Sequence, residues 1–297
     1  MSFPIPDEKA LQKCLNFENQ PTYIATGGFK AVYQLKFSDG SADEAIKAVF
    51  IPQASSDEES LQRDQLVARA KREIKALNAC THPNIVKLGR VDAEMREIDG
   101  SDYLVYSEEF LPGYALDQWL NAGTQVGFDE LLVLFESILS LIKDLANLGY
   151  LHRDIKPNNI MESNDPNRRF VVLDMGIAYK MEGTQLTQGG NPPGTLRYMA
   201  PELLKPDYKD NMDFRCDLYS AGMTVYVLAA GAHPFAPSPQ DPYATVYRII
   251  NTQPAALYSV RPDLPKAFCQ IIDRCIRKRP ALRYNTIDLV QTQLGNI

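Results

Sequence analysis

The chain has 297 residues, of which 45% are hydrophobic and 23% are charged, and its net charge is -6. This length can bury a sizeable core, and the ordinary composition excludes a disordered or low-complexity chain. The basic residues are spread along the sequence, so we expect neither a nucleic-acid groove nor an anionic membrane surface as a partner.

The N-terminal sequence MSFPIPDEKALQK lacks the apolar segment of a signal peptide, and no run of about twenty apolar residues could span a bilayer. The five cysteines are odd in number and scattered, without CxxC spacing. This pattern indicates reduced thiols rather than disulfides or a zinc site. We therefore expect a cytoplasmic protein without a membrane partner.

The first third of the chain predicts a small α+β lobe. After an N-terminal extension at 1–20, with one short helix, runs rich in Val, Ile, Tyr and Phe between Tyr23 and Phe50 predict three antiparallel strands. Apolar residues then recur at helical spacing over 57–79, which predicts one long amphipathic helix. Two more strands are predicted at 85–91 and 103–107.

The rest of the chain predicts mainly helix. A broad apolar stripe follows helical spacing from Phe128 to Leu148, as expected for a helix buried on one side. Pro112-Gly113 interrupts the pattern before this region, so a boundary between two lobes is expected at about 108–114.

The string HRDIKPNN at 152–159 carries the most specific signal for chemistry. It resembles the catalytic loop of the protein kinase family, and a chance match of this length is improbable. The resemblance implies that Asp154 accepts the proton of the attacking hydroxyl and that Asn159 supplies an oxygen to Mg²⁺. Lys156 would meet the transferring phosphate, and a lysine there marks the serine/threonine members of the family.

Two later strings extend the resemblance. Asp174-Met175-Gly176 resembles the family's DFG element with Met in place of Phe, and it implies that Asp174 binds the Mg²⁺ that bridges the ATP phosphates. GTLRYMAPE at 194–202 resembles the end of the activation segment, which small-molecule phosphotransferases do not need. It implies that Thr195 hydrogen-bonds near the catalytic aspartate.

The resemblance also implies two structural anchors in the second lobe. Glu202 is expected to form a buried ion pair with an arginine near the C-terminus, for which Arg283 is the candidate. Asp217 is expected to hold the backbone of the catalytic loop. Because Arg153 precedes the catalytic aspartate, either Thr184 or Thr187 is a candidate phosphorylation site, with an ordinary exposed threonine as the alternative.

In the first lobe, Ala45-Ile46-Lys47 resembles the family's β3 lysine motif. Lys47 would hold the α- and β-phosphates of ATP, and Glu73 of the long helix would be its ion-pair partner. Aligned on the hinge, Glu108 takes the gatekeeper position, where the family has an apolar or small polar residue. A buried carboxylate there must find a partner or become protonated.

The phosphate-covering loop is less regular. Ala25 and Lys30 stand where the family has its first and third glycines, and Gly27 keeps the central one. Glycine matters there because its backbone N–H can approach a phosphate without a Cβ in the way. The nucleotide-binding residues implied by the resemblance are Ala25, Gly27, Gly28, Val32, Ala45, Lys47, Glu109, Leu111 and Met161.

Together these features predict an α+β protein with a bilobal protein-kinase fold. The kinase domain is expected at 21–297, with the N-lobe at about 21–107, the hinge at about 108–114 and the C-lobe at about 115–297. The predicted function is ATP- and Mg²⁺-dependent transfer of the γ-phosphate to Ser or Thr of proteins, including the chain itself. A pseudokinase or ATP-binding scaffold and a small-molecule phosphotransferase stay open as alternatives.

Overall fold

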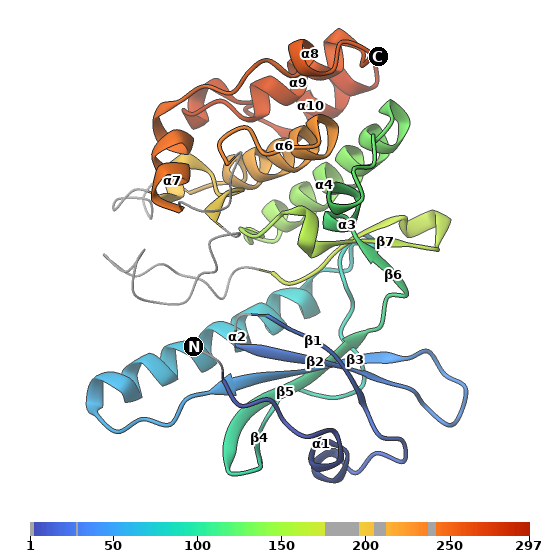
Figure 1. The fold of residues 1–297 in the computed structure, drawn as a ribbon, viewed down its shortest axis with the longest axis vertical. Helices are drawn as coiled ribbons and strands as arrows, with labels where there is room; N and C mark the ends of the chain where they lie inside the picture. Colours follow the sequence, from blue (N-terminus) through green and yellow to red (C-terminus); the bar gives the residue numbers. More distant parts are fainter. Residues whose placement is uncertain (1–2, 28, 176–195, 205–211, 237–241) are drawn as a thin grey trace. The chain divides into compact units, whose positions relative to one another are not determined.

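The structure is a computed structural model that describes residues 3–27, 29–175, 196–204, 212–236 and 242–297. Their contacts divide them into two compact units (Figure 1). The first contains Met1–Thr81 and Val86–Pro112, and the second contains His82–Ile85 and most of the chain from Gly113 onward. No helix in the described ranges is long and apolar enough to cross a membrane.

An antiparallel five-stranded sheet, in the order β1-β2-β3-β5-β4, forms the centre of the first unit. The three strands predicted between Tyr23 and Phe50 are confirmed, and the strand predicted at 103–107 lies inside β5. The strands are β1 (Thr22–Gly27), β2 (Lys30–Leu35), β3 (Glu44–Ile51), β4 (Glu94–Ile98) and β5 (Ser101–Glu109).

The strand predicted at 85–91 is wrong. Ile85 and Leu88 make isolated bridges, and a few backbone hydrogen bonds join residues 87–91 to β5, but no regular strand forms. The strand that was not predicted is β4, whose sequence EMREI is mostly charged. Ile85 and Val86 are buried in an irregular segment. Their apolar side chains therefore indicate burial, which is not evidence of strand pairing. Asp99 and Gly100, both at positive φ, form the two-residue turn that joins β4 to β5.

Two helices pack on opposite faces of this sheet. α2 (Asp57–Ala79), with the bounds predicted from periodicity, packs Ala70 and its neighbours against Val49 and Tyr106. α1 (Glu8–Leu15) buries Leu11 completely against the other face, which Tyr33 helps to form. Figure 1 shows α1 and α2 on the two sides of the strands.

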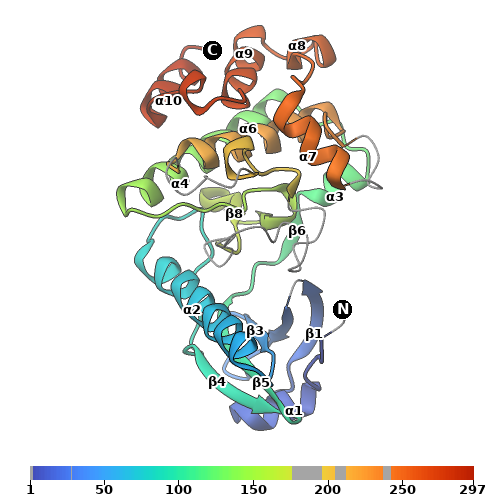
Figure 2. The ribbon, with the colours of Figure 1, turned by 90° about the vertical axis from the view of Figure 1, so that its left-hand side faces the viewer.

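The second unit is mainly helical, as predicted. Its longest helix, α4 (Phe128–Asn147), buries the predicted apolar stripe and packs against α6 (Arg215–Ala230), which is buried on nearly all sides (Figure 2). A small sheet of β6 (Gly113–Ala115), β7 (Ile160–Ser163) and β8 (Phe170–Val172) lies in the same unit. The other α-helices described are α3 (Asp117–Asn121), α7 (Pro242–Asn251), α8 (Leu257–Val260), α9 (Lys266–Cys275) and α10 (Ile287–Leu294).

Gly113, at the start of β6, is required by the backbone. Its φ of 150° lies in a region that side chains rarely adopt, and a Cβ at this position would strike the carbonyl oxygen of Glu162 on β7. The glycine therefore allows the close pairing of β6 with β7.

Candidate active site

Three of the predicted site residues, Asp154, Lys156 and Asn159, come together in the second unit, in the loop between α4 and β7. Lys156 Nζ lies 2.9 and 2.8 Å from the two carboxylate oxygens of Asp154. Asn159 Nδ2 donates to Asp154 Oδ2 at 2.7 Å and to the Asp154 carbonyl at 3.0 Å. Burial raises the pKa of Asp154, against the opposing effects of Lys156 and Asn159. The carboxylate is therefore both fixed in orientation and made more basic.

The backbone of this loop is held by Asp217, as the resemblance implied. The side chain of Asp217 lies on α6, is fully buried and accepts hydrogen bonds from the N–H groups of His152 and Arg153, both at 2.7 Å. These bonds hold Arg153 at a φ of 66°, which is unfavourable for a residue with a side chain. Burial raises the pKa of Asp217 to about 6, although the two hydrogen bonds act in the other direction.

Asp174 lies beside the catalytic loop. The N–H of Leu173, which follows β8, donates to the carbonyl of Asn159 at 2.7 Å, and the charge of Asp174 contributes to the raised pKa of Asp154. Asp174 has a φ of 44°, another strained position of the kind that collects at functional sites. The structure thus brings together the two residues predicted as metal ligands, Asn159 and Asp174.

These two residues fit a magnesium ion bound with a nucleotide. Since the Asn159 amide nitrogen is used by Asp154, its oxygen is the atom that can ligate a metal. Among the described residues no group of three or more His, Cys, Asp or Glu side chains could hold a metal ion by itself. Mg²⁺ does not need one, because it is usually bound by one or two protein oxygens together with phosphate oxygens and water.

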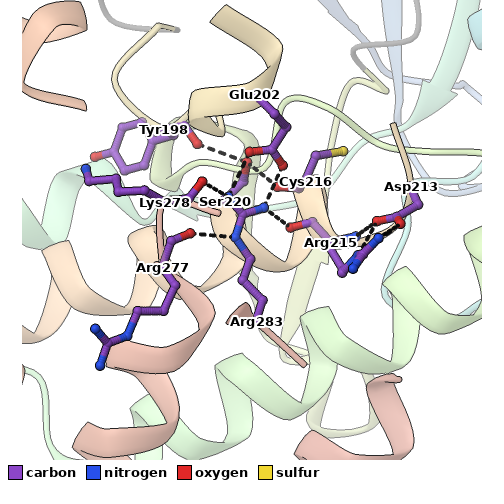
Figure 3. A network of polar contacts seen from close by, with 9 residues as sticks. All are labelled: Tyr198, Glu202, Asp213, Arg215, Cys216, Ser220, Arg277, Lys278 and Arg283. Atoms are coloured by element: carbon purple, nitrogen blue, oxygen red, sulfur yellow. Dashed lines mark hydrogen bonds and ion pairs between the residues drawn. The ribbon is translucent and has the colours of Figure 1, made fainter. Parts of the chain in front are cut away.

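The predicted ion pair of Glu202 with Arg283 is confirmed (Figure 3). Arg283 is 1% exposed, and its two terminal nitrogens donate to the two Glu202 oxygens at 2.6 and 2.8 Å. Further bonds run from Arg283 to the carbonyls of Arg215 and Arg277, both at 2.8 Å. The pair therefore ties the 3₁₀ turn Pro201–Leu204 to α6 and to the segment before α10.

In the first unit, Lys47 and Glu108 form a buried ion pair with 2.6 Å between Nζ and Oε2. The side chains are 7% and 2% exposed. In the β3–β5 register Lys47 lies opposite Tyr106, and Glu108 is two residues further on the same face. The expected burial of a carboxylate at this position is confirmed, and Lys47 is the partner that it required.

Glu73 on α2 contacts Lys30, a lysine that was not predicted as its partner. Its Oε1 lies 3.1 Å from Nζ of Lys30, the residue that stands in place of a loop glycine. The Lys47–Glu73 pair stays a prediction. The pairing with Lys30 could not be predicted, because it depends on the register between β2 and β3. This register sets Val32 opposite Lys47 and thereby places Lys30 on the face of the sheet that α2 covers.

The other described residues of the first unit that are expected to bind the nucleotide lie in its strands or shortly after them. Val32 and Ala45 are partly exposed on the same face as Lys47, and a Cβ added to Gly27 would meet nothing within 4 Å. The open space at Gly27 leaves room for a ligand such as a phosphate. Ala25 is exposed on β1, and Leu111 is partly exposed after the end of β5.

Glu109 is the last residue of β5, and its N–H donates to the carbonyl of Lys87 at 2.9 Å. Only its carbonyl is therefore suited to meet an adenine. Met161 lies in β7 of the second unit, where it is partly buried and pairs with Ala115 and Val171. The predicted residues that lie outside the described part of the chain are Gly28, Gly176, Thr184, Thr187, Gly194 and Thr195.

Comparisons with known proteins agree with these features. Residues 19–294 match the model of the protein kinase domain. The chain is 26% identical over 272 residues to the probable serine/threonine-protein kinase PknB of Lactococcus lactis, and 32% identical over 244 residues to the serine/threonine-protein kinase pkn3 of Myxococcus xanthus. These matches cover 92% and 79% of this chain but only 40% and 42% of the relatives, so the chain spans about two fifths of their length.

The fold has close counterparts among solved structures. The crystal structure of the Mycobacterium tuberculosis PknI kinase domain superposes with a TM-score of 0.64 at 22% identity, over 93% of this chain and 94% of that one. Both the order of the motifs and the match over nearly the whole chain thus lead to one assignment. The chain belongs to the protein kinase family, and to the part of it that contains the serine/threonine-protein kinases.

Proposed function

We propose that this chain transfers the γ-phosphate of ATP, with Mg²⁺, to serine or threonine hydroxyls of proteins, including its own, and that it acts in the cytoplasm. The observation that carries the proposal is the fixed group of Asp154, Lys156 and Asn159, in which one carboxylate is oriented by an ammonium and an amide. The names of the curated relatives support a Ser/Thr acceptor.

Each side chain of the loop has a role in this proposal. Asp154 accepts the proton of the acceptor hydroxyl and directs the oxygen toward the phosphorus. Lys156, held against Asp154, contributes positive charge where negative charge develops on the transferred group. Asp217 keeps the loop backbone in its strained conformation, so that these groups need not rearrange during the reaction.

Each unit carries its own residues that are expected to bind the nucleotide. Asn159 and Asp174 would hold Mg²⁺, which neutralises phosphate charge when it is bound. Lys47 would contact the α- and β-phosphates, and Thr195 would support the acceptor near Asp154. We retain 21–297 as the proposed extent of the kinase domain and 108–114 as its hinge.

The test is incubation of the purified chain with labelled ATP and Mg²⁺, followed by detection of label on the chain, on generic protein substrates and on small alcohols. Label on Ser or Thr that disappears in Asp154→Ala and persists in Asp129→Ala, an exposed aspartate at the start of α4, is the expected result. Nucleotide binding without any transfer would instead indicate an ATP-binding scaffold, which the kinase relatives do not support. Label on alcohols alone would indicate a small-molecule phosphotransferase.

A further inference from the structure

The segment that precedes the first strand is built into the sheet that carries Lys47. Residues 3–15 lie outside the region matched by the kinase domain model, which begins at residue 19. We propose that this segment positions the end of the phosphate-covering loop, Phe29 and Lys30, by holding Phe29 in place through Phe3. The inference rests on the proposed function, because it assigns the loop a nucleotide.

The segment is anchored at several points along its length. Two buried tyrosines of the sheet donate their hydroxyls to its carbonyls, Tyr33 to Pro6 at 2.6 Å and Tyr103 to Pro4 at 2.9 Å. Burial raises the pKa of both tyrosines, so they stay protonated as donors. Leu11 of α1 is fully buried in the apolar cluster on this face. Buried hydroxyls and a buried leucine together indicate a fixed element rather than a loose tail.

A cluster of rings joins the segment to the loop. The ring of Phe3 stacks on Phe50 of β3 at 5.9 Å between centroids and contacts Phe29, the last residue before β2, at 6.3 Å. The N–H of Phe50 also donates to the carbonyl of Phe29 at 2.8 Å. Phe29 is therefore fixed both through its backbone and through its side chain.

The loop is also held from the opposite face of the sheet. Lys30 follows Phe29 directly, and because successive residues of a strand point to opposite faces, its side chain reaches Glu73 on α2. The end of the loop is therefore held on both faces of the sheet: Phe29 contacts Phe3 on one face, and Lys30 contacts α2 on the other. A loop whose end is fixed before the nucleotide arrives loses less conformational entropy on binding, so the segment should increase nucleotide affinity.

Two variants remove different contacts between the N-terminal segment and the sheet. Phe3→Ala removes the ring that contacts Phe29, and the double variant Tyr33→Phe/Tyr103→Phe removes the two hydroxyl bonds while it keeps every ring. Ile5→Ala is the matched control, because Ile5 lies in the same segment with a side chain that is 47% exposed. The measurements are hydrogen exchange of the amides at 25–35 without nucleotide, the dissociation constant of Mg-ATP, and kcat and KM for ATP.

Phe3→Ala and the double variant are expected to speed hydrogen exchange in the loop. Both should raise the dissociation constant of Mg-ATP and the KM for ATP by about 3- to 10-fold, which is the range of one lost aromatic contact. The change in kcat should be smaller than the change in KM. Ile5→Ala should match the wild type. Unchanged loop exchange in both variants would overturn the proposal. If Phe3→Ala fails to fold, the double variant decides. If the wild type binds no nucleotide, the proposed function fails, and the exchange data still show whether the segment holds the loop.

Discussion

Replacement of Arg283 by methionine tests the main polar anchor of the second unit. Met keeps much of the apolar volume but leaves Glu202, which is 8% exposed, without the guanidinium that contacts both of its oxygens. Loss of one partner of a buried ion pair costs about 3–5 kcal/mol, because the other charge stays buried without compensation. Typical proteins are stable by about 5–15 kcal/mol, so this is a large fraction of the total.

The assay is urea unfolding of the nucleotide-free protein at pH 7, followed by circular dichroism. The expected decrease in the free energy of unfolding for Arg283→Met is about 3–5 kcal/mol. Arg279→Met is the control: Arg279 is exposed four residues earlier, and its replacement should change stability by less than about 0.5 kcal/mol. Arg283→Lys should also be destabilising, since one ammonium cannot reproduce the two parallel bonds to Glu202.

A second variant separates the charge from the packing. Glu202→Leu/Arg283→Met leaves no isolated charge, so it should be more stable than Arg283→Met alone. The reasoning is refuted if Arg283→Met lies within about 1 kcal/mol of the wild type. It is also refuted if the double variant is the less stable of the two.

Three further predictions concern the same unit. Asp217→Asn removes one acceptor from a buried site that receives two backbone N–H groups. It should therefore lower the free energy of unfolding by about 1–3 kcal/mol and reduce kcat. An unchanged urea midpoint together with an unchanged kcat would contradict this prediction. Asn159→Ala should raise the Mg²⁺ concentration needed for half-maximal transfer, and an identical Mg²⁺ titration would exclude it as a ligand. Burial lowers the pKa of Lys278 to about 8 from its ordinary 10.5, so its contribution to stability is fully present above pH 10.5 and is lost as the pH falls through 8. The stability of the wild type relative to Lys278→Met should therefore rise between pH 8 and 10, and a difference that does not vary with pH would rule out this titration.

The sequence alone predicted the features that depend on neighbours along the chain. The long helices at 57–79 and from Phe128 were visible in the spacing of apolar residues, because a helix repeats its buried face every three or four positions. The group of Asp154, Lys156 and Asn159 could be named because one short string, HRDIKPNN, resembles the kinase catalytic loop, and a 3₁₀ turn there brings the three residues into contact. Glu202 and Arg283 are 81 residues apart, and only the resemblance to the family paired them.

Tertiary structure alone revealed two ion pairs of the first unit that the sequence did not predict. Lys47 contacts Glu108 and Lys30 contacts Glu73 because of strand register and the packing of α2, neither of which leaves a local pattern. The strand prediction at 85–91 failed for the same reason. An apolar run shows that a segment is buried, but it does not show which other segment it pairs with. Local spacing in this protein determines the elements and the catalytic loop, whereas contacts between distant residues depend on how the sheet and helices assemble.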